Sequence, residues 1–121
     1  MRRRLVVLVG VFLVFQFGFS NACGMRYKLE KGKIYYYNNF KDRIEIKEVN
    51  YKTFEIISNT LAKDTNNIYY LGEKVNGVNS KTFKITKEYG ELVFDCYRTS
   101  YVIEDNGNQV FLEYTKFKNE K

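Results

Sequence analysis

The chain of 121 residues contains no histidine, no tryptophan and no proline, and it has only two cysteines. Without histidine, the Ser–His and Cys–His arrangements that activate a nucleophile are excluded, and the commonest zinc ligand sets are missing as well. No glycine-rich phosphate loop with the Walker pattern occurs. The carboxylates are scattered along the chain. We therefore expect no enzyme, no metal site and no cofactor.

The segment 1–22 has the order of a secretory signal peptide. Three arginines at positions 2–4 precede an apolar run from Leu5 to Phe19, and small or polar residues follow at positions 20–22. The run has 15 residues, fewer than the roughly 20 that span a bilayer as a helix. We expect residues 1–22 to be the signal peptide and residues 23–121 to be one exported domain.

The basic character of the chain comes largely from that first segment. Removal of its three arginines lowers the formal net charge from +6 to +3, and lysine and glutamate are interspersed in the remainder. Nucleic-acid binding requires a concentrated basic patch. We therefore do not expect nucleic acid to be a partner.

Both cysteines lie in the exported part, and Cys23 has two competing interpretations. It follows Ala22 and precedes Gly24, as in a bacterial lipobox, although Ser20 stands where leucine is usual. In this interpretation Cys23 carries a lipid anchor and the protein belongs to the cell envelope. In the other, Cys23 and Cys96 form a disulfide, which an exported compartment permits and which would contribute about 4 kcal/mol. A third alternative leaves both thiols free.

The mature chain contains an internal repeat, which is the signature of a stacked architecture. The segment KIYYYNN followed by VNYKTFEI matches NIYYLGE followed by VNSKTFKI. The first parts match at an offset of 34 and the second parts at an offset of 29. A degenerate third unit aligns residues 94–103 with residues 61–70 at an offset of 33.

Turn and strand signals alternate within each unit. Residues 64–67, of sequence DTNN, favour a turn because Asx side chains bond their own backbone, whereas the following Ile-Tyr-Tyr favours a strand. Asn106-Gly107 predicts another tight turn. The Asp64 and Asp105 segments faintly suggest calcium loops, but they lack the later acidic ligands, so turn chemistry is favoured. The prediction is a mainly β fold of antiparallel strand and hairpin repeats, with two clear units and one degenerate unit.

Strand periodicity assigns the tyrosines to two faces, because successive residues point to opposite sides. A core face is predicted for the pairs Ile34 and Tyr36, Ile68 and Tyr70, and Tyr101 and Ile103. Tyr35, Tyr69 and Val102 are then predicted to line the opposite face. Such a ladder is either structural, through cross-strand aromatic pairs, or a platform for a ligand.

The segment Ala62-Lys63-Asp64, with Asn66 and Tyr69-Tyr70 after it, resembles the DKNYY family of exported bacterial repeat proteins. The resemblance is good over residues 61–86, partial over 33–57 and faint over 94–117. The family has no established activity. The resemblance therefore implies export and repeat architecture, and it implies no catalytic residues.

Two hypotheses for function remain. The first is a non-catalytic lipoprotein of the cell envelope with a structural or protein-interaction role. The alternative is a glycan- or cell-wall-binding module that uses Tyr35 and Tyr69 against sugar rings, distantly similar to choline- or glucan-binding repeats. Those repeats usually depend on tryptophan. The expected partners are an envelope protein or a glycan, and the membrane if Cys23 is acylated.

Overall fold

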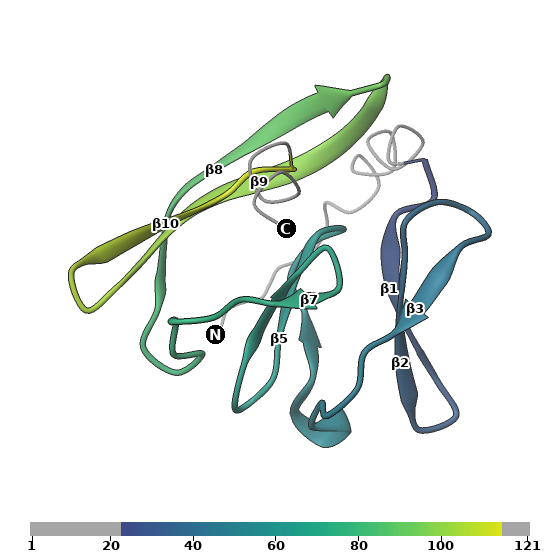
Figure 1. Cartoon of the computed structure of the whole chain (residues 1–121), viewed down its shortest axis with the longest axis horizontal. Coiled ribbons are helices and arrows are strands. Elements are labelled where there is room, and N and C mark those ends of the chain that lie inside the picture. The colour runs from purple at the N-terminus through teal and green to yellow at the C-terminus, as the bar shows by residue number, and fades with distance from the viewer. Residues whose placement is uncertain (1–22, 115–121) are drawn as a thin grey trace, which may run out of the picture.

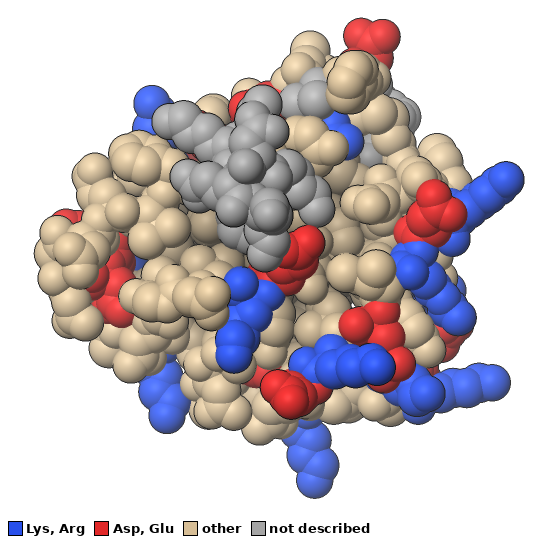
Figure 2. Space-filling model, in the orientation of Figure 1, with Lys and Arg blue, Asp and Glu red and all other residues tan. Residues whose placement is uncertain are grey.

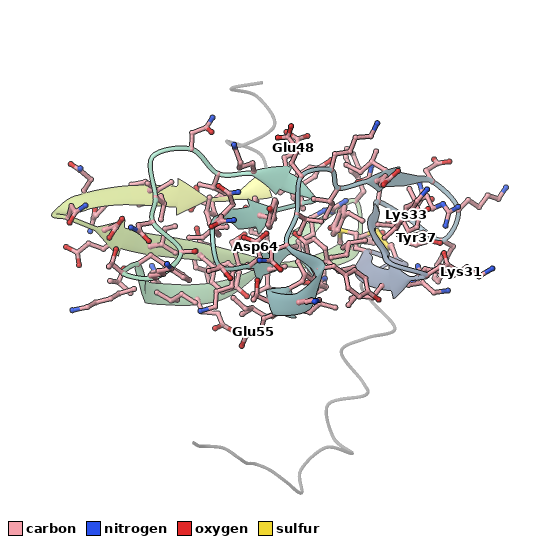
Figure 3. All side chains as sticks on the ribbon, turned by 90° about the horizontal axis from the view of Figure 1, so that it is seen from below. Lys31, Lys33, Tyr37, Glu48, Glu55 and Asp64 are labelled. Atoms are coloured by element: carbon pink, nitrogen blue, oxygen red, sulfur yellow. A yellow bond between two sulfur atoms is a disulfide. The ribbon has the colours of Figure 1, made fainter. Side chains whose placement is uncertain are left out.

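The computed structural model describes residues 23–114, so the predicted signal peptide lies outside the described residues. The fold is mainly β, as predicted, and consists of three antiparallel sheets that lie side by side (Figure 1). Viewed at right angles to this, the molecule is a flattened slab (Figure 3). Below, each sheet is called a unit, although the repeated segment 33–57 extends from the first sheet into residues 55–56 of the second.

The first sheet has the order β1 (Arg26–Glu30), β2 (Lys33–Tyr37) and β3 (Arg43–Glu45). The second has the order β4 (Glu55–Ile56), β5 (Leu61–Lys63), β6 (Ile68–Tyr70) and β7 (Glu73–Lys74). The third has the order β10 (Asn108–Leu112), β9 (Cys96–Asp105) and β8 (Lys84–Val93). A short 3-10 helix, η2 (Tyr51–Thr53), joins the first two sheets.

Four strand pairs are joined by two-residue turns in which both residues have positive φ: Lys31–Gly32, Leu71–Gly72, Phe94–Asp95 and Asn106–Gly107. Positive φ at both positions is the signature of the type I′ turn, whose twist matches that of a hairpin. Asn106–Gly107 confirms the predicted turn. Phe94–Asp95 has no glycine, although its φ angles are 54° and 64°.

The residues predicted for the core face are buried in all three units, which confirms that part of the prediction. Ile34, Ile68, Tyr70, Tyr101 and Ile103 have no exposed surface, and Tyr36 has almost none. Full burial of one such side chain stabilises the fold by roughly 1.5–3 kcal/mol. These side chains form one continuous core that runs through the three sheets.

One backbone hydrogen bond recurs at equivalent positions of the first two units. The backbone N–H of Ile46 donates to the carbonyl of Ile34 at 2.8 Å, and that of Val75 donates to Ile68 at 2.9 Å. The two donors are related by the offset of 29 and the two acceptors by the offset of 34, which are the offsets of the sequence repeat. The sequence repeat is therefore also a repeat of backbone geometry.

The alignment predicted for the third unit is wrong by eight positions. Ile56 pairs with Ala62, and the equivalent Ile85 pairs with Ile103. The chain between the partners is much longer in the third unit than in the second, so the β8–β9 hairpin carries an insertion. Residues 102–112 therefore correspond to residues 61–71 at an offset of 41. We call the β8–β9 hairpin, residues 84–105, the long hairpin.

Candidate interaction surface

The carboxylate of Asp64 joins the first unit to the second. Its Oδ1 accepts hydrogen bonds from the backbone N–H groups of Asn66 at 2.8 Å and Asn67 at 2.7 Å. Its Oδ2 accepts from the backbone N–H of Asn50 at 2.8 Å and from the Tyr69 hydroxyl at 3.0 Å. The turn role predicted for Asp64 is confirmed, and Asn50, which caps η2, ties the preceding loop to it.

The hydrogen-bond donors around Asp64 determine the direction in which its pKa is shifted. Burial alone would raise its pKa, but the backbone hydrogen bonds from Asn50, Asn67 and Asn66 outweigh that effect and lower the pKa below its usual value. Hydrogen bonds to the charged form favour it. Asp64 lies near the middle of the slab (Figure 3), and its oxygens serve the chain itself.

The same contact recurs between the second unit and the third. Asp105 Oδ2 accepts from the backbone N–H of Asn79 at 2.9 Å, and Oδ1 accepts from the Thr82 hydroxyl at 2.6 Å. These two bonds, Thr82 first, lower the pKa of Asp105. Asn79 is the equivalent of Asn50 at the offset of 29, and Asp105 is the equivalent of Asp64 at the offset of 41. We call each of these contacts an Asp–Asn joint.

The predicted ladder of Tyr35 and Tyr69 on an exposed face is wrong. Tyr69 is only 2% exposed, because Phe54 from the loop after η2 covers it with ring centroids 6.1 Å apart. Burial, assisted by the hydrogen bond to Asp64, raises the pKa of Tyr69 to about 12. Tyr35 lies in a different sheet, is half-buried, and has the Arg43 guanidinium 3.9 Å from its ring centroid.

Val102, which was predicted to lie on the same face as that ladder, is buried as well, with 8% exposed. The chain itself thus covers this face at Tyr69 and at Val102. The structure does not bring Tyr35, Tyr69 and Val102 together into a binding face.

Tyr27 makes a connection that the repeat pattern did not predict. Its hydroxyl donates to the carbonyl of Thr60 at 2.8 Å and accepts from the backbone N–H of Gly72 at 3.1 Å. Tyr27 belongs to the first unit and both partners belong to the second. Desolvation by burial raises its pKa well above the usual value, so the hydroxyl remains protonated and able to donate.

The two cysteines are joined: Cys23 and Cys96 form a disulfide with their Cα atoms 5.5 Å apart. This is the second of the two alternatives that the sequence left open, and a lipid thioether on Cys23 would require the same sulfur atom. The bond attaches the long hairpin to the start of the first unit. In Figure 1 the hairpin tip lies above that sheet, on the same side of the molecule.

Two further contacts hold the long hairpin against the second unit. The Thr60 hydroxyl donates to the carbonyl of Thr99 at 2.6 Å, and the Asn59 side-chain amide donates to the carbonyl of Tyr97 at 3.2 Å. The long hairpin, which belongs to the third unit, is therefore attached to both the first unit and the second.

An apolar groove lies between the first and second sheets. Its volume is about 570 Å³, and its lining includes Met25, Phe40, Ile56 and Ile57. Phe40 is 73% exposed and Ile56 is 46% exposed. Gly24 at the rim has a left-handed φ of 82°, and a Cβ there would lie 2.5 Å from the Phe40 backbone nitrogen. Only glycine permits this close approach.

The exposed apolar side chains are distributed over the surface differently from the charged ones. On the face shown in Figure 2, lysine and arginine lie mostly toward the right and lower border, with aspartate and glutamate interspersed among them. At the tip of the long hairpin, by contrast, Leu92 is 71% and Phe94 is 88% exposed. Of the large apolar side chains described, the three most exposed, Phe94, Phe40 and Leu92, therefore lie near the disulfide or the groove.

The sequence pattern around Asp64 now has a physical explanation. Asp64 forms the joint, its backbone N–H donates to the carbonyl of Asn67 at 2.9 Å, Tyr69 donates to its carboxylate, and Tyr70 fills the core. Neither a curated protein nor a solved structure matches the chain. The model of the DKNYY family matches residues 8–118, nearly the whole sequence, and the chain therefore belongs to the DKNYY family.

Proposed function

We propose that this chain is an exported, non-catalytic repeat protein of the cell envelope, which acts as a structural or interaction module. Its partner is a protein that inserts an apolar side chain into the groove between the first and second sheets. The groove carries the proposal, since it is a concave apolar surface bordered by an aromatic side chain that is largely exposed.

The chemistry of the groove suits binding rather than proton transfer. Among the residues that the structure describes, the lining contains no carboxylate and no thiol, and the polar groups at its edge are Arg26, Ser58 and Asn59. Tyr27 also contributes, but its hydroxyl is engaged with Thr60. An apolar anchor surrounded by a polar rim is the usual anatomy of a protein interface.

The disulfide supports export, because disulfides persist in oxidising compartments outside the cytosol. Within residues 23–114, no helix is long and apolar enough to cross a membrane. The lipid anchor expected at Cys23 competes with the disulfide for one sulfur atom. Intact mass of the mature protein separates the two: a gain of two hydrogens on reduction indicates the bridge, and an added diacylglycerol indicates the anchor.

The groove is tested by site-specific photocrosslinking in the cells that produce the protein. A photoreactive phenylalanine analogue is placed at position 40, and the matched control is the same analogue at Phe111, which is 46% exposed on β10. We expect a discrete protein adduct from position 40 that is absent from position 111 and is lost in the Ile56→Asp variant. Equal adducts from both positions, or none from position 40, would overturn the proposal.

The glycan alternative is tested by co-sedimentation with purified cell wall. Binding that survives Phe40→Ala and is lost in Tyr35→Ala would favour the glycan over the groove. Tyr69 is unsuited to this comparison, because it is buried and its substitution disturbs the joint at Asp64.

A further inference from the structure

The strand β8 has ten residues and is paired on one side only within the described chain. The order of the third sheet is β10-β9-β8, which places β8 at its edge. Most of its residues are exposed, and its outer edge runs along the border of the molecule in Figure 1. An open edge of this length exposes backbone donors and acceptors that can pair with another strand.

The hairpin turn determines which groups face outward. Val93 and Cys96 flank the two-residue turn Phe94–Asp95, so they form a hydrogen-bonded pair. Backbone groups alternate in direction along an antiparallel strand. Residues 87, 89 and 91 therefore bond to β9, while Glu88, Gly90 and Leu92 direct their N–H and C=O groups outward. A bulge between Ile85 and Lys87 interrupts this order, so the regular edge is 87–93.

We propose that β8 pairs antiparallel with β8 of a second copy of this chain, with the two-fold axis passing through Tyr89. For two residues that lie opposite each other, the backbone N–H and C=O groups must either both point toward the shared edge or both point away from it. A two-fold axis must therefore pass through a residue of the strand. The proposal is independent of the groove, which lies between the first two sheets.

Charge selects the residue on the axis. An axis at Tyr89 places Lys87 opposite Glu91 of the second copy, and this pair occurs twice by symmetry. An axis at Glu88 would place two glutamates opposite each other, and an axis at Lys87 would do the same with two lysines. An axis at Gly90 forms no pair of opposite charge. Opposite charges across strands stabilise the pairing, and like charges destabilise it.

The geometry of β8 fits this register. Lysine on an edge strand usually deters pairing, but here each Lys87 meets a glutamate. Glu91 is already held in place, since its Oε1 accepts from the Ser100 hydroxyl at 2.5 Å and from the backbone N–H of Tyr114 at 3.1 Å. Leu92, which is 71% exposed in one copy, would lie opposite Thr86 of the other.

The first test is crosslinking at the axis. Two Tyr89 Cα atoms in a non-hydrogen-bonded pair lie about 4.5 Å apart, within the range for a disulfide. We expect Tyr89→Cys in the full, oxidised domain to form a covalent dimer under a mild oxidant. The matched control is Lys84→Cys, also on β8 and exposed, whose copies would lie about 33 Å apart. Equal crosslinking of both variants would overturn the register.

The second test is a charge exchange followed by light scattering over rising protein concentration. We expect the wild type to become dimeric, and Lys87→Glu to weaken the association by about tenfold or more, because two like-charge pairs replace two attractive ones. The double variant Lys87→Glu with Glu91→Lys should regain dimerisation. Circular dichroism confirms that each variant is folded. A wild type that stays monomeric at millimolar concentration would refute the proposal.

Discussion

The second and third units begin with equivalent loops, and each is joined to the preceding unit by an Asp–Asn joint. The second unit is nevertheless compact, whereas the third reaches across the molecule. In the second unit, Ile56 pairs with Ala62 across a short loop, whereas in the third the equivalent Ile85 pairs with Ile103 only after the whole insertion. The extra length carries Cys96 to Cys23. A repeat can thus change its role through insertion within one hairpin, while its joint to the preceding unit stays the same.

We expect the largest effect from removal of the disulfide near the tip of the long hairpin. Replacing both Cys23 and Cys96 by serine should lower the free energy of unfolding by about 4 kcal/mol, since the bridge closes a loop of 73 residues. Urea unfolding measures the loss. Hydrogen exchange should show increased opening at residues 90–99, while β5 and β6 remain protected until global unfolding. If residues 90–99 and the strands β5 and β6 exchange equally in the variant, the disulfide does not specifically stabilise the long hairpin.

The two Asp–Asn joints should differ in strength. Asp64→Ala removes an acceptor shared by four donors and should cost about 3 kcal/mol, because three part-buried N–H groups and the buried Tyr69 hydroxyl lose a charged partner. Asp105→Ala removes an acceptor for two donors and should cost less. Thermal or urea unfolding of the two variants provides the comparison, and a larger loss at Asp105 would contradict it.

Because of the two Asp–Asn joints, we expect the free energy of unfolding to fall in acid. The folded pKa of Asp64 and of Asp105 lies below the usual carboxyl value, so the unfolded chain binds more protons between the two pKa values. The stabilisation is present above about pH 4, the ordinary aspartate pKa, and it is lost as pH falls through the folded pKa. Urea midpoints between pH 2 and 6 should show this slope. Asp64→Asn should flatten it, whereas Asp42→Asn, at an exposed residue, should not.

The smallest effect concerns the turn of the long hairpin. Phe94 has a left-handed φ of 54°, which costs a bulky residue roughly 1 kcal/mol. Phe94→Asn with Asp95→Gly should therefore raise stability by about 1 kcal/mol, since it recreates the Asn106–Gly107 turn. The reciprocal Asn106→Phe should lower stability by a similar amount. A destabilised double variant would show that the Phe94 ring contributes contacts that outweigh its backbone strain.

The alternation of residues predicted the buried faces because it depends only on strand geometry. Ile34, Ile68 and Tyr101 are buried as expected, and the turn at Asp64 followed from its own side chain. Local chemistry was sufficient for these features. It also left the disulfide as one of two uses for Cys23.

Features that depend on distant residues were not predictable in the same way. Tyr69 is covered by Phe54 from the loop after η2, which no strand pattern shows. The third unit was misaligned because residues 101–103 resemble the Ile-Tyr-Tyr strand, while the insertion had moved the true equivalent eight positions further. The groove combines residues 24–27, Phe40 and 56–59, and three separate segments with no shared motif gave no signal.

The separation of the two cysteines has a consequence for the order of events during biogenesis. A chain that crosses a membrane with its amino end first delivers Cys23 early and Cys96 only 73 residues later. The bridge closes only when the third unit has arrived and folded against the first. In a chain exported as proposed above, formation of the bridge would thus report that translocation is nearly complete.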